Sequence, residues 1–227
     1  MASLYDSAHS QEIEHEVALK YVFNFTRMIE ITSMLDVGSG TGRAVKFFLE
    51  NDPLIKINGV EPVEDLIKQA TQKNKIPKEL LICASGEKLP FKNEYFDAAC
   101  AFGVMHHVKK PNLVVKEMTR VAKKAIFISD SNRFGQGSMA TRWLKLILYK
   151  AGLWSLADLI KTRGQGHTFS QGDGLAYSYS VFDSYNTLAK WADRIILIPT
   201  SKNTDQKSWL HPLLNSSHVL TCAIKNV

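Results

Sequence analysis

A glycine-rich turn holds the residue types in this chain that are best suited to chemistry. Residues 35–42 read Leu-Asp-Val-Gly-Ser-Gly-Thr-Gly at the end of an apolar run, and Glu61 closes the next apolar run. Glycines let a backbone approach a ligand closely, and a carboxylate can accept hydrogen bonds from both hydroxyls of a ribose. The pattern predicts a nucleoside-binding crevice at the carboxyl edge of a parallel sheet.

Asp36 indicates the charge of the ligand. This carboxylate stands two residues before the first glycine, so it would repel a pyrophosphate on the turn and attract an ammonium or sulfonium group. Arg43 occupies the place where a dinucleotide-binding fingerprint has its third glycine. We therefore expect S-adenosylmethionine as the ligand, with S-adenosylhomocysteine as the product, rather than NAD.

Four segments in order resemble the class I S-adenosylmethionine-dependent methyltransferases. The glycine turn resembles the first motif of that family, and Val60-Glu61-Pro62 resembles the second. Residues 84–97 resemble the segment that lines the adenine pocket, and residues 102–108 resemble the stretch that faces the reacting methyl group. The resemblance spans residues 33–130, which is more specific than one glycine turn. It implies an enzyme that transfers a methyl group.

The resemblance also implies roles for single residues. Asp36 would help to hold the ammonium group, Glu61 would accept the ribose hydroxyls, and Phe102 would offer its backbone carbonyl near the amino acid moiety. Ser85 stands where relatives often carry an aspartate beside the adenine amino group, so its hydroxyl or the backbone at Gly86 would hold the adenine. The other expected cofactor contacts are Gly38, Ser39, Gly40, Gly42, Pro62 and Glu87.

Three histidines are candidate general bases, because histidine titrates near neutrality. The resemblance places His106 and His107 beside the methyl group. His167 lies in a segment rich in glycine and serine, from which it would reach down as part of a lid. Each histidine also has a structural interpretation. His106 and His107 can pack against or cap the following loop, and His167 can be a solvent-exposed loop residue.

The substrate is expected to lie under the segment 131–182. Six basic residues and one acidic residue between positions 131 and 165 carry most of the net charge of +6. This bias favours an acceptor with a carboxylate or phosphate group, with Arg142, Tyr177 and Tyr179 as candidate contacts. It would equally suit a helix on an anionic membrane surface that methylates a lipid or quinone. A solvated basic helix face and tyrosines packed on the sheet are the structural alternatives.

Other classes of function are less favoured. The chain has no Asn/Asp-Pro-Pro-aromatic motif of the kind that amino-methylating nucleic-acid enzymes carry, and its basic excess is modest, so nucleic acid is an unfavoured partner. A non-catalytic S-adenosylmethionine-binding subunit would be indicated by a degraded glycine turn, whereas this turn is intact. The favoured function is methyl transfer to an oxygen or nitrogen of a small organic metabolite.

The elements that position these residues alternate between strand and helix, which predicts an α/β fold. We expect a doubly wound, Rossmann-like sheet of seven strands with an antiparallel last strand, and an insertion after the fifth strand. The predicted strands are 31–37, 55–60, 80–84, 96–102, 125–129, 194–199 and 218–224. The predicted helices are 11–30, 41–51, one from about 62, 111–122, 139–149, 155–161 and 184–193, and 164–179 is expected to be a loop.

Length and composition suit a single domain. The 227 residues with 45% hydrophobic content would form a helical cover (1–31), a cofactor-binding core (33–130), a substrate-cover insertion (131–182) and a C-terminal helix with strands (183–227). No secretory signal or membrane-spanning run is evident, so we expect a cytoplasmic protein. Cys83, Cys100 and Cys222 lie in apolar runs without metal-binding spacing and are expected to be buried, reduced thiols.

Overall fold

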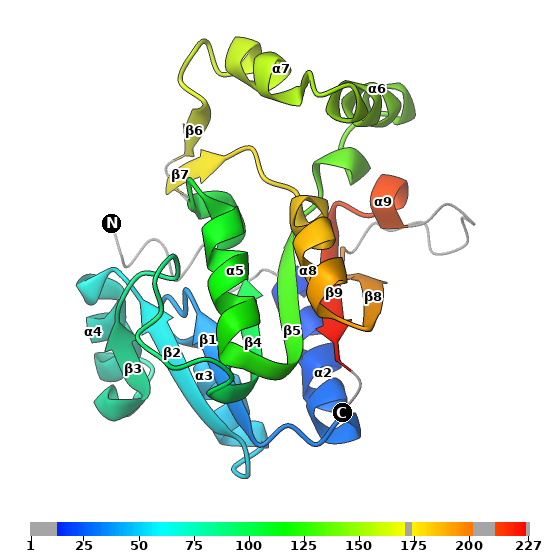
Figure 1. Ribbon diagram of the computed structural model, residues 1–227. Helices are drawn as coiled ribbons and strands as arrows, with labels where there is room; N and C mark the ends of the chain where they lie inside the picture. The colour runs from blue at the N-terminus through cyan, green and yellow to red at the C-terminus, as the bar shows by residue number, and fades with distance from the viewer. Residues whose placement is uncertain (1–12, 171–173, 202–211, 226–227) are drawn as a thin grey trace.

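Seven strands form one mixed sheet in the order β3-β2-β1-β4-β5-β9-β8 (Figure 1). The computed structural model describes residues 13–170, 174–201 and 212–225. β9 pairs antiparallel with both β5 and β8, so the predicted seven-stranded sheet with an antiparallel last strand is confirmed. The strands are β1 Ser33–Val37, β2 Lys56–Glu61, β3 Leu81–Cys83, β4 Phe96–Phe102, β5 Ala122–Ser131, β8 Arg194–Pro199 and β9 His218–Ile224.

Helices cover both faces of this sheet. One face packs against α2, α3 and α4, and the other packs against α5 and α8. These helices are α2 Ile13–Met28, α3 Arg43–Asn51, α4 Glu64–Gln72, α5 Pro111–Val121 and α8 Tyr185–Trp191. The predicted helices therefore all form, with ends that differ by a few residues from the expected ones, as is usual for helix termini.

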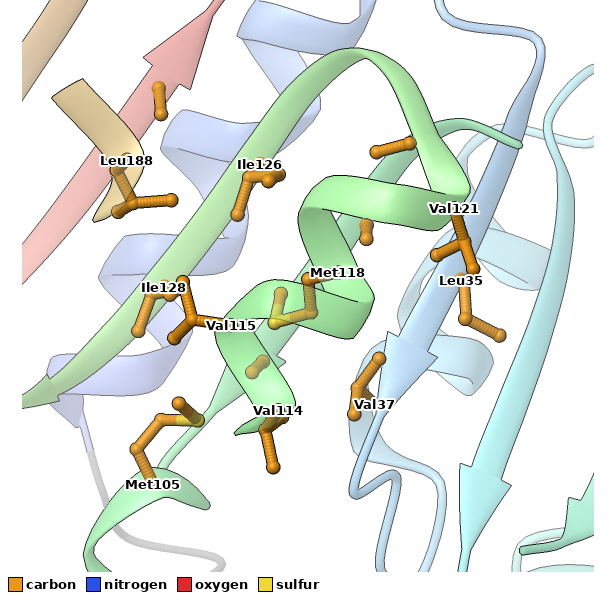
Figure 2. Close-up of a cluster of buried hydrophobic side chains, with 14 of the residues drawn as sticks. Leu35, Val37, Met105, Val114, Val115, Met118, Val121, Ile126, Ile128 and Leu188 are labelled. Carbon is orange, nitrogen blue, oxygen red and sulfur yellow. The ribbon is translucent and has the colours of Figure 1, made fainter. Parts of the chain in front are cut away.

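The core beneath α5 follows from the spacing of its apolar residues. Val114, Val115, Met118 and Val121 recur at helical intervals and are fully buried. Figure 2 shows them over the side chains of the sheet, Leu35 and Val37 on β1 and Ile126 and Ile128 on β5. Pro111 begins the helix, where its fixed φ suits the first turn and its missing N–H is not needed.

The strand order creates a switch point between β1 and β4. These neighbours run parallel, but the chain leaves β1 toward α3 on one face and leaves β4 toward α5 on the other face. Loops that diverge in this way open a crevice at the carboxyl ends of the strands. The glycine turn and the residues after β4 therefore flank the crevice that the sequence predicts.

The insertion stands beyond the carboxyl edge of the sheet (Figure 1). It contains the expected helices, α6 Met139–Lys150 and α7 Trp154–Lys161. The prediction of a loop over 164–179 is wrong in part, because β6 His167–Ser170 and β7 Gly174–Tyr177 pair as an antiparallel hairpin. The glycines and serines of this segment obscured two strands of only four residues each. Four short 3-10 helices, η1 Lys78–Leu80, η2 Met105–His107, η3 Arg133–Gly135 and η4 Val181–Ser184, and the short helix α9 Pro212–Asn215 complete the described elements.

One prediction about the cysteines is also wrong. Cys100 and Cys222 are buried free thiols, but Cys83 is exposed. β3 is a three-residue edge strand, and Cys83 lies at its exposed end.

Within the described residues, no helix is long and apolar enough to cross a membrane. Those same ranges contain no group of three or more His, Cys, Asp or Glu side chains that could hold a metal ion.

Candidate functional site

The glycine turn is shaped by packing at one glycine and by open space at another. Gly38 and Gly40 both have positive φ, 73° and 55°, a region that favours glycine. A Cβ on Gly38 would lie 2.5 Å from Cγ1 of Val104, whereas a Cβ on Gly40 would meet no heavy atom within 4 Å. Gly38 is therefore needed for packing, and Gly40 leaves free space above the turn that a ligand can fill.

Glu61 is bonded to the same turn. Its Oε2 accepts the N–H of Gly40 at 3.0 Å, and its Oε1 accepts the N–H of Val63 at 3.0 Å. Burial raises the pKa of this carboxyl above its ordinary value, and the two backbone N–H groups oppose that shift. Each oxygen keeps a further lone pair. The carboxylate is thus held in place while it can still accept the two hydroxyls of a ribose.

Asp36 is a buried carboxyl that suits a cationic ligand. It is 3% exposed, and burial raises its pKa to about 7, with the Glu61 charge adding to the shift and the Cys100 thiol and Arg43 opposing it. Cys100 Sγ lies 3.8 Å from Oδ1. A buried carboxylate is costly without a positive partner. An ammonium group entering the cavity beside Asp36 would supply one.

A cavity of about 560 Å³ opens over the turn. Asp36, the turn and the stretch after β4 form its floor, and α2 and α3 supply the opposite wall. The volume falls in the usual range for small-molecule sites. Of the expected cofactor contacts, Asp36, Gly38, Ser39, Gly40 and Phe102 line this cavity. Open space at Gly40, a fixed carboxylate at Glu61 and a buried acid at Asp36 together fit S-adenosylmethionine.

The predicted adenine contacts form a separate turn after β3. The hydroxyl of Ser85 accepts the N–H of Glu87 at 3.2 Å, and a Cβ on Gly86 would lie 2.8 Å from Val37 Cγ1. The turn therefore lies close to the end of β1. Pro62 follows Glu61 directly, and its carbonyl faces Cys83 Sγ at 3.8 Å. The structure thus places Ser85, Gly86 and Glu87 at the carboxyl edge, beside the strand that leads into the glycine turn.

His106 is held by a buried carboxylate. Its Nδ1 lies 2.8 Å from Oδ1 of Asp130, which is fully buried at the end of β5. Asp130 also accepts the N–H groups of Met105 at 2.9 Å and Ser131 at 2.6 Å. Burial would raise the pKa of Asp130, but His106 and the Ser131 N–H outweigh it, so this pKa lies below its ordinary value. An ionised Asp130 places the proton of His106 on Nδ1 and leaves Nε2 as the basic nitrogen.

His107 connects the cofactor side of the site to the insertion. Its Nδ1 donates to the carbonyl oxygen of Leu175 at 2.7 Å, which ties the β6–β7 hairpin to the stretch after β4. The charge of His107 also acts on Glu61. His167 and Tyr177 face each other across the hairpin, with ring centroids 6.1 Å apart. The structure therefore brings His107 and the hairpin together, and His167 and Tyr177 lie on the hairpin and not among the residues that line the cavity.

Sequence patterns did not single out Asp130 or the buried polar residues beside it. His15 of α2 is buried, and its Nδ1 lies 3.1 Å from Ser129 Oγ. Burial lowers the pKa of His15 to about 3, so its ring is neutral at ordinary pH. A Cβ on Gly103 would lie 2.7 Å from His15 Nε2. The position of Asp130 at a strand end, as for Asp36 and Glu61, was the signal that could have revealed it.

Two predicted substrate contacts serve the fold instead. Tyr179 is 4% exposed, and its hydroxyl lies 2.7 Å from Ser184 Oγ, so it does not present a phenol to an acceptor. Arg142 donates to the carbonyl oxygens of Gly137 at 2.8 Å and Leu214 at 2.7 Å, which ties α6 to α9. Tyr179 therefore follows the structural alternative, whereas Arg142 is bonded to the protein and is not part of a solvated helix face.

This chain is similar to known methyltransferases. Residues 35–128 match the family model described as a methyltransferase domain. An uncharacterized methyltransferase of Mycobacterium leprae is 27% identical over 167 residues, which cover 73% of this chain. The matched region spans 61% of that relative's length.

Solved structures share the fold at low sequence identity. The methyltransferase domain of bacterial CtHen1 has a TM-score of 0.60 at 13% identity and covers 93% of this chain and 99% of its own. A protein of Pyrococcus horikoshii has a TM-score of 0.60 at 18% identity and covers 98% of this chain and 95% of its own. At these identities the likeness extends to the fold.

Proposed function

We propose that the chain, whose residues 35–128 match a methyltransferase domain, uses S-adenosylmethionine to methylate an oxygen or nitrogen of a small organic metabolite. S-adenosylmethionine supplies an activated methyl carbon when it is bound. The protein then has to align the acceptor, exclude water and remove a proton from a hydroxyl or amine. The residues of this chain suit each of these tasks.

The glycine turn and two carboxylates would hold the cofactor. Gly40 leaves the space for it, and Glu61 would accept its ribose hydroxyls while it stays bonded to the turn. Asp36 would accept its ammonium group, which would lower the cost of burying that carboxylate. The turn at Ser85, Gly86 and Glu87 would border the adenine.

The observation that carries the proposal is the pair His106–Asp130. A general base has to be held at a fixed position, and the buried, ionised carboxylate of Asp130 holds the His106 ring through Nδ1. By the family resemblance, this stretch would lie beside the methyl group. A subunit that only bound S-adenosylmethionine would have no need for a histidine held in this way.

The insertion would cover the acceptor. The β6–β7 hairpin is fastened to His107, and the hairpin carries the candidate contact Tyr177 and the candidate base His167. A cover that is bonded to the residue next to the base would exclude water while it positions a small acceptor. This arrangement supports a small organic substrate over a long polymer.

Methyl transfer from radiolabelled S-adenosylmethionine to a panel of phenols, carboxylic acids and amines tests the proposal. We expect turnover with at least one hydroxyl or amine acceptor, and loss of that turnover in a His106→Gln variant whose cofactor affinity, measured by calorimetry, is unchanged. Failure to bind the cofactor would contradict the proposal at its premise. Full activity in the variant would contradict the assignment of the base.

A further inference from the structure

α6 turns Arg142, Lys145 and Tyr149 toward the protein and a row of apolar side chains outward. Arg142 and Lys145 donate to carbonyl oxygens, and Tyr149 packs edge-on against Phe134 with ring centroids 5.2 Å apart. On the opposite side of the same helix, the exposed fractions are 46% for Trp143, 55% for Leu144 and 60% for Ile147. This is the reverse of the pattern in a helix that packs on a core.

α7 repeats the arrangement. Trp154 faces inward, because its Nε1 donates to Ser178 Oγ at 3.0 Å and its ring lies 4.8 Å from the guanidinium of Arg133. Leu156, Leu159 and Ile160 are exposed by 57%, 47% and 72%. None of the residues of α6 or α7, which the structure describes in full, is buried. The outward apolar residues of the two helices, named above, form what we call the α6–α7 face.

The charge around this face is positive. Residues 139–163 contain five basic residues and one acidic residue. Lys150, Lys161 and Arg163 are exposed, and Lys150 stands on the same side of α6 as Trp143. An anionic partner would attract these exposed cations.

We infer that the α6–α7 face docks on an anionic lipid bilayer. Outward leucine, isoleucine and tryptophan side chains flanked by lysine and arginine are the composition of a helix that lies in the headgroup region. Lysine stems can lie along the apolar boundary while their charges reach the headgroups. A two-fold contact between copies of this chain is less suited, because it would set the cations of one face against those of the other.

Docking of this face would turn the methyl-transfer site toward the bilayer. α6 and α7 lie beyond the carboxyl edge of the sheet (Figure 1), which is the edge that carries the glycine turn and His106. Binding to lipid does not depend on methyl transfer. If the protein does not transfer a methyl group, the inferred lipid binding can still be correct. If the protein does not bind lipid, the proposed methyl transfer can still be correct.

The test is flotation of the intact protein with vesicles of phosphatidylcholine alone or of phosphatidylcholine mixed with phosphatidylglycerol. We expect binding to the mixed vesicles only, weakening with added salt, and quenching of tryptophan fluorescence by brominated lipid. The double variant Trp143→Gln/Ile147→Gln should bind at least about tenfold more weakly. Reversal of a charge on the same side as Trp143, as in Lys150→Glu, should weaken binding about fivefold or more.

Matched changes at the opposite edge of the sheet serve as controls. Leu54 is 84% exposed in the turn before β2, and Lys56 begins that strand, so Leu54→Gln and Lys56→Glu should leave lipid binding unchanged. If the first double variant does not fold, as judged by its thermal melt and S-adenosylmethionine affinity, Leu156→Gln/Ile160→Gln tests the same face independently.

Three outcomes would overturn the inference. They are no flotation with either vesicle, binding that the face variants and the control variants weaken equally, and a dimer in solution that the face variants convert to monomer without any lipid binding. The last outcome would assign the face to a second copy of the chain.

Discussion

The N–H of Gly40 donates to the Glu61 carboxylate at 3.0 Å, so the open glycine of the turn and the predicted ribose acceptor form one unit. Glu61→Gln should therefore weaken S-adenosylmethionine binding by about 10- to 100-fold, because it replaces charged hydrogen bonds with neutral ones. Calorimetry measures the affinity. Glu64→Gln, on the exposed first turn of α4, is the matched control and should bind normally. Equal affinities in the two variants would remove Glu61 from the ribose site.

Gly38 and Gly40 should respond differently to alanine. Gly38→Ala drives a Cβ into Val104, so we expect a loss of about 1–3 kcal/mol in the free energy of unfolding. Gly40→Ala meets open space and should lose only about 1 kcal/mol from backbone strain, but its methyl group would occupy the ligand's place. Chemical denaturation measures the change in the free energy of unfolding, and cofactor titration measures the change in affinity. Normal cofactor binding by Gly40→Ala would show that the ligand does not pass over this glycine.

Cofactor affinity should rise with pH through neutrality. Asp36, with a pKa raised by burial to about 7, must lose its proton to pair with an ammonium group. Below pH 7 the affinity should therefore fall by about tenfold per pH unit. Calorimetry in buffers of different ionisation enthalpy should also detect the released proton. Asp36→Asn should bind more weakly and without this pH dependence, and a flat profile in the unaltered protein would contradict the assignment.

The carboxyl of Asp36 should also lower the free energy of unfolding at high pH. Its pKa of about 7 in the folded state lies above the ordinary value for an aspartate, so the folded state binds the proton more tightly than the unfolded state does. Stability is thus lost as pH rises from about 4 through 7, by up to roughly 4 kcal/mol. Asp36→Asn should be more stable than the unaltered protein at pH 8 and nearly equal to it at pH 4. Urea denaturation at pH 4 and at pH 8 measures the difference in the free energy of unfolding between the two proteins.

Asp130→Asn should slow methyl transfer while it leaves the cofactor in place. Without the carboxylate, the preferred tautomer of His106 is lost, and we expect turnover to fall by about 10²- to 10⁴-fold, as in His106→Gln. A shifted pH profile of kcat in Asp130→Asn would distinguish a positioning role from a merely structural one. Asp65→Asn, on the surface of α4, is the matched control. Unchanged turnover and pH profile would show that Asp130 does not act through His106.

The cofactor half of the fold was predictable because its signals are local. Gly38, Gly40 and Glu61 lie at strand ends, and parallel strands bring such ends to one edge. The pair His106–Asp130 joins η2, which follows β4, to β5, so no single sequence motif contains both residues. Tyr179 and Arg142 were assigned to the substrate from residue type alone, whereas burial and backbone contacts decide their roles. The hairpin was missed because its strands are shorter than the usual pattern of alternation.

The position of β9 in the sheet sets an order of assembly. β8 precedes β9 in the chain but joins the sheet only through it, since β9 pairs with β5 on one side and β8 on the other. Asn132, just after β5, donates to the carbonyl oxygens of Leu213 and Ser216, so the segment leading into β9 also closes the edge beside Asp130. During synthesis the cofactor-binding strands can pair before β8 joins the sheet. The edge beside Asp130 should therefore be among the last parts of the protein to form.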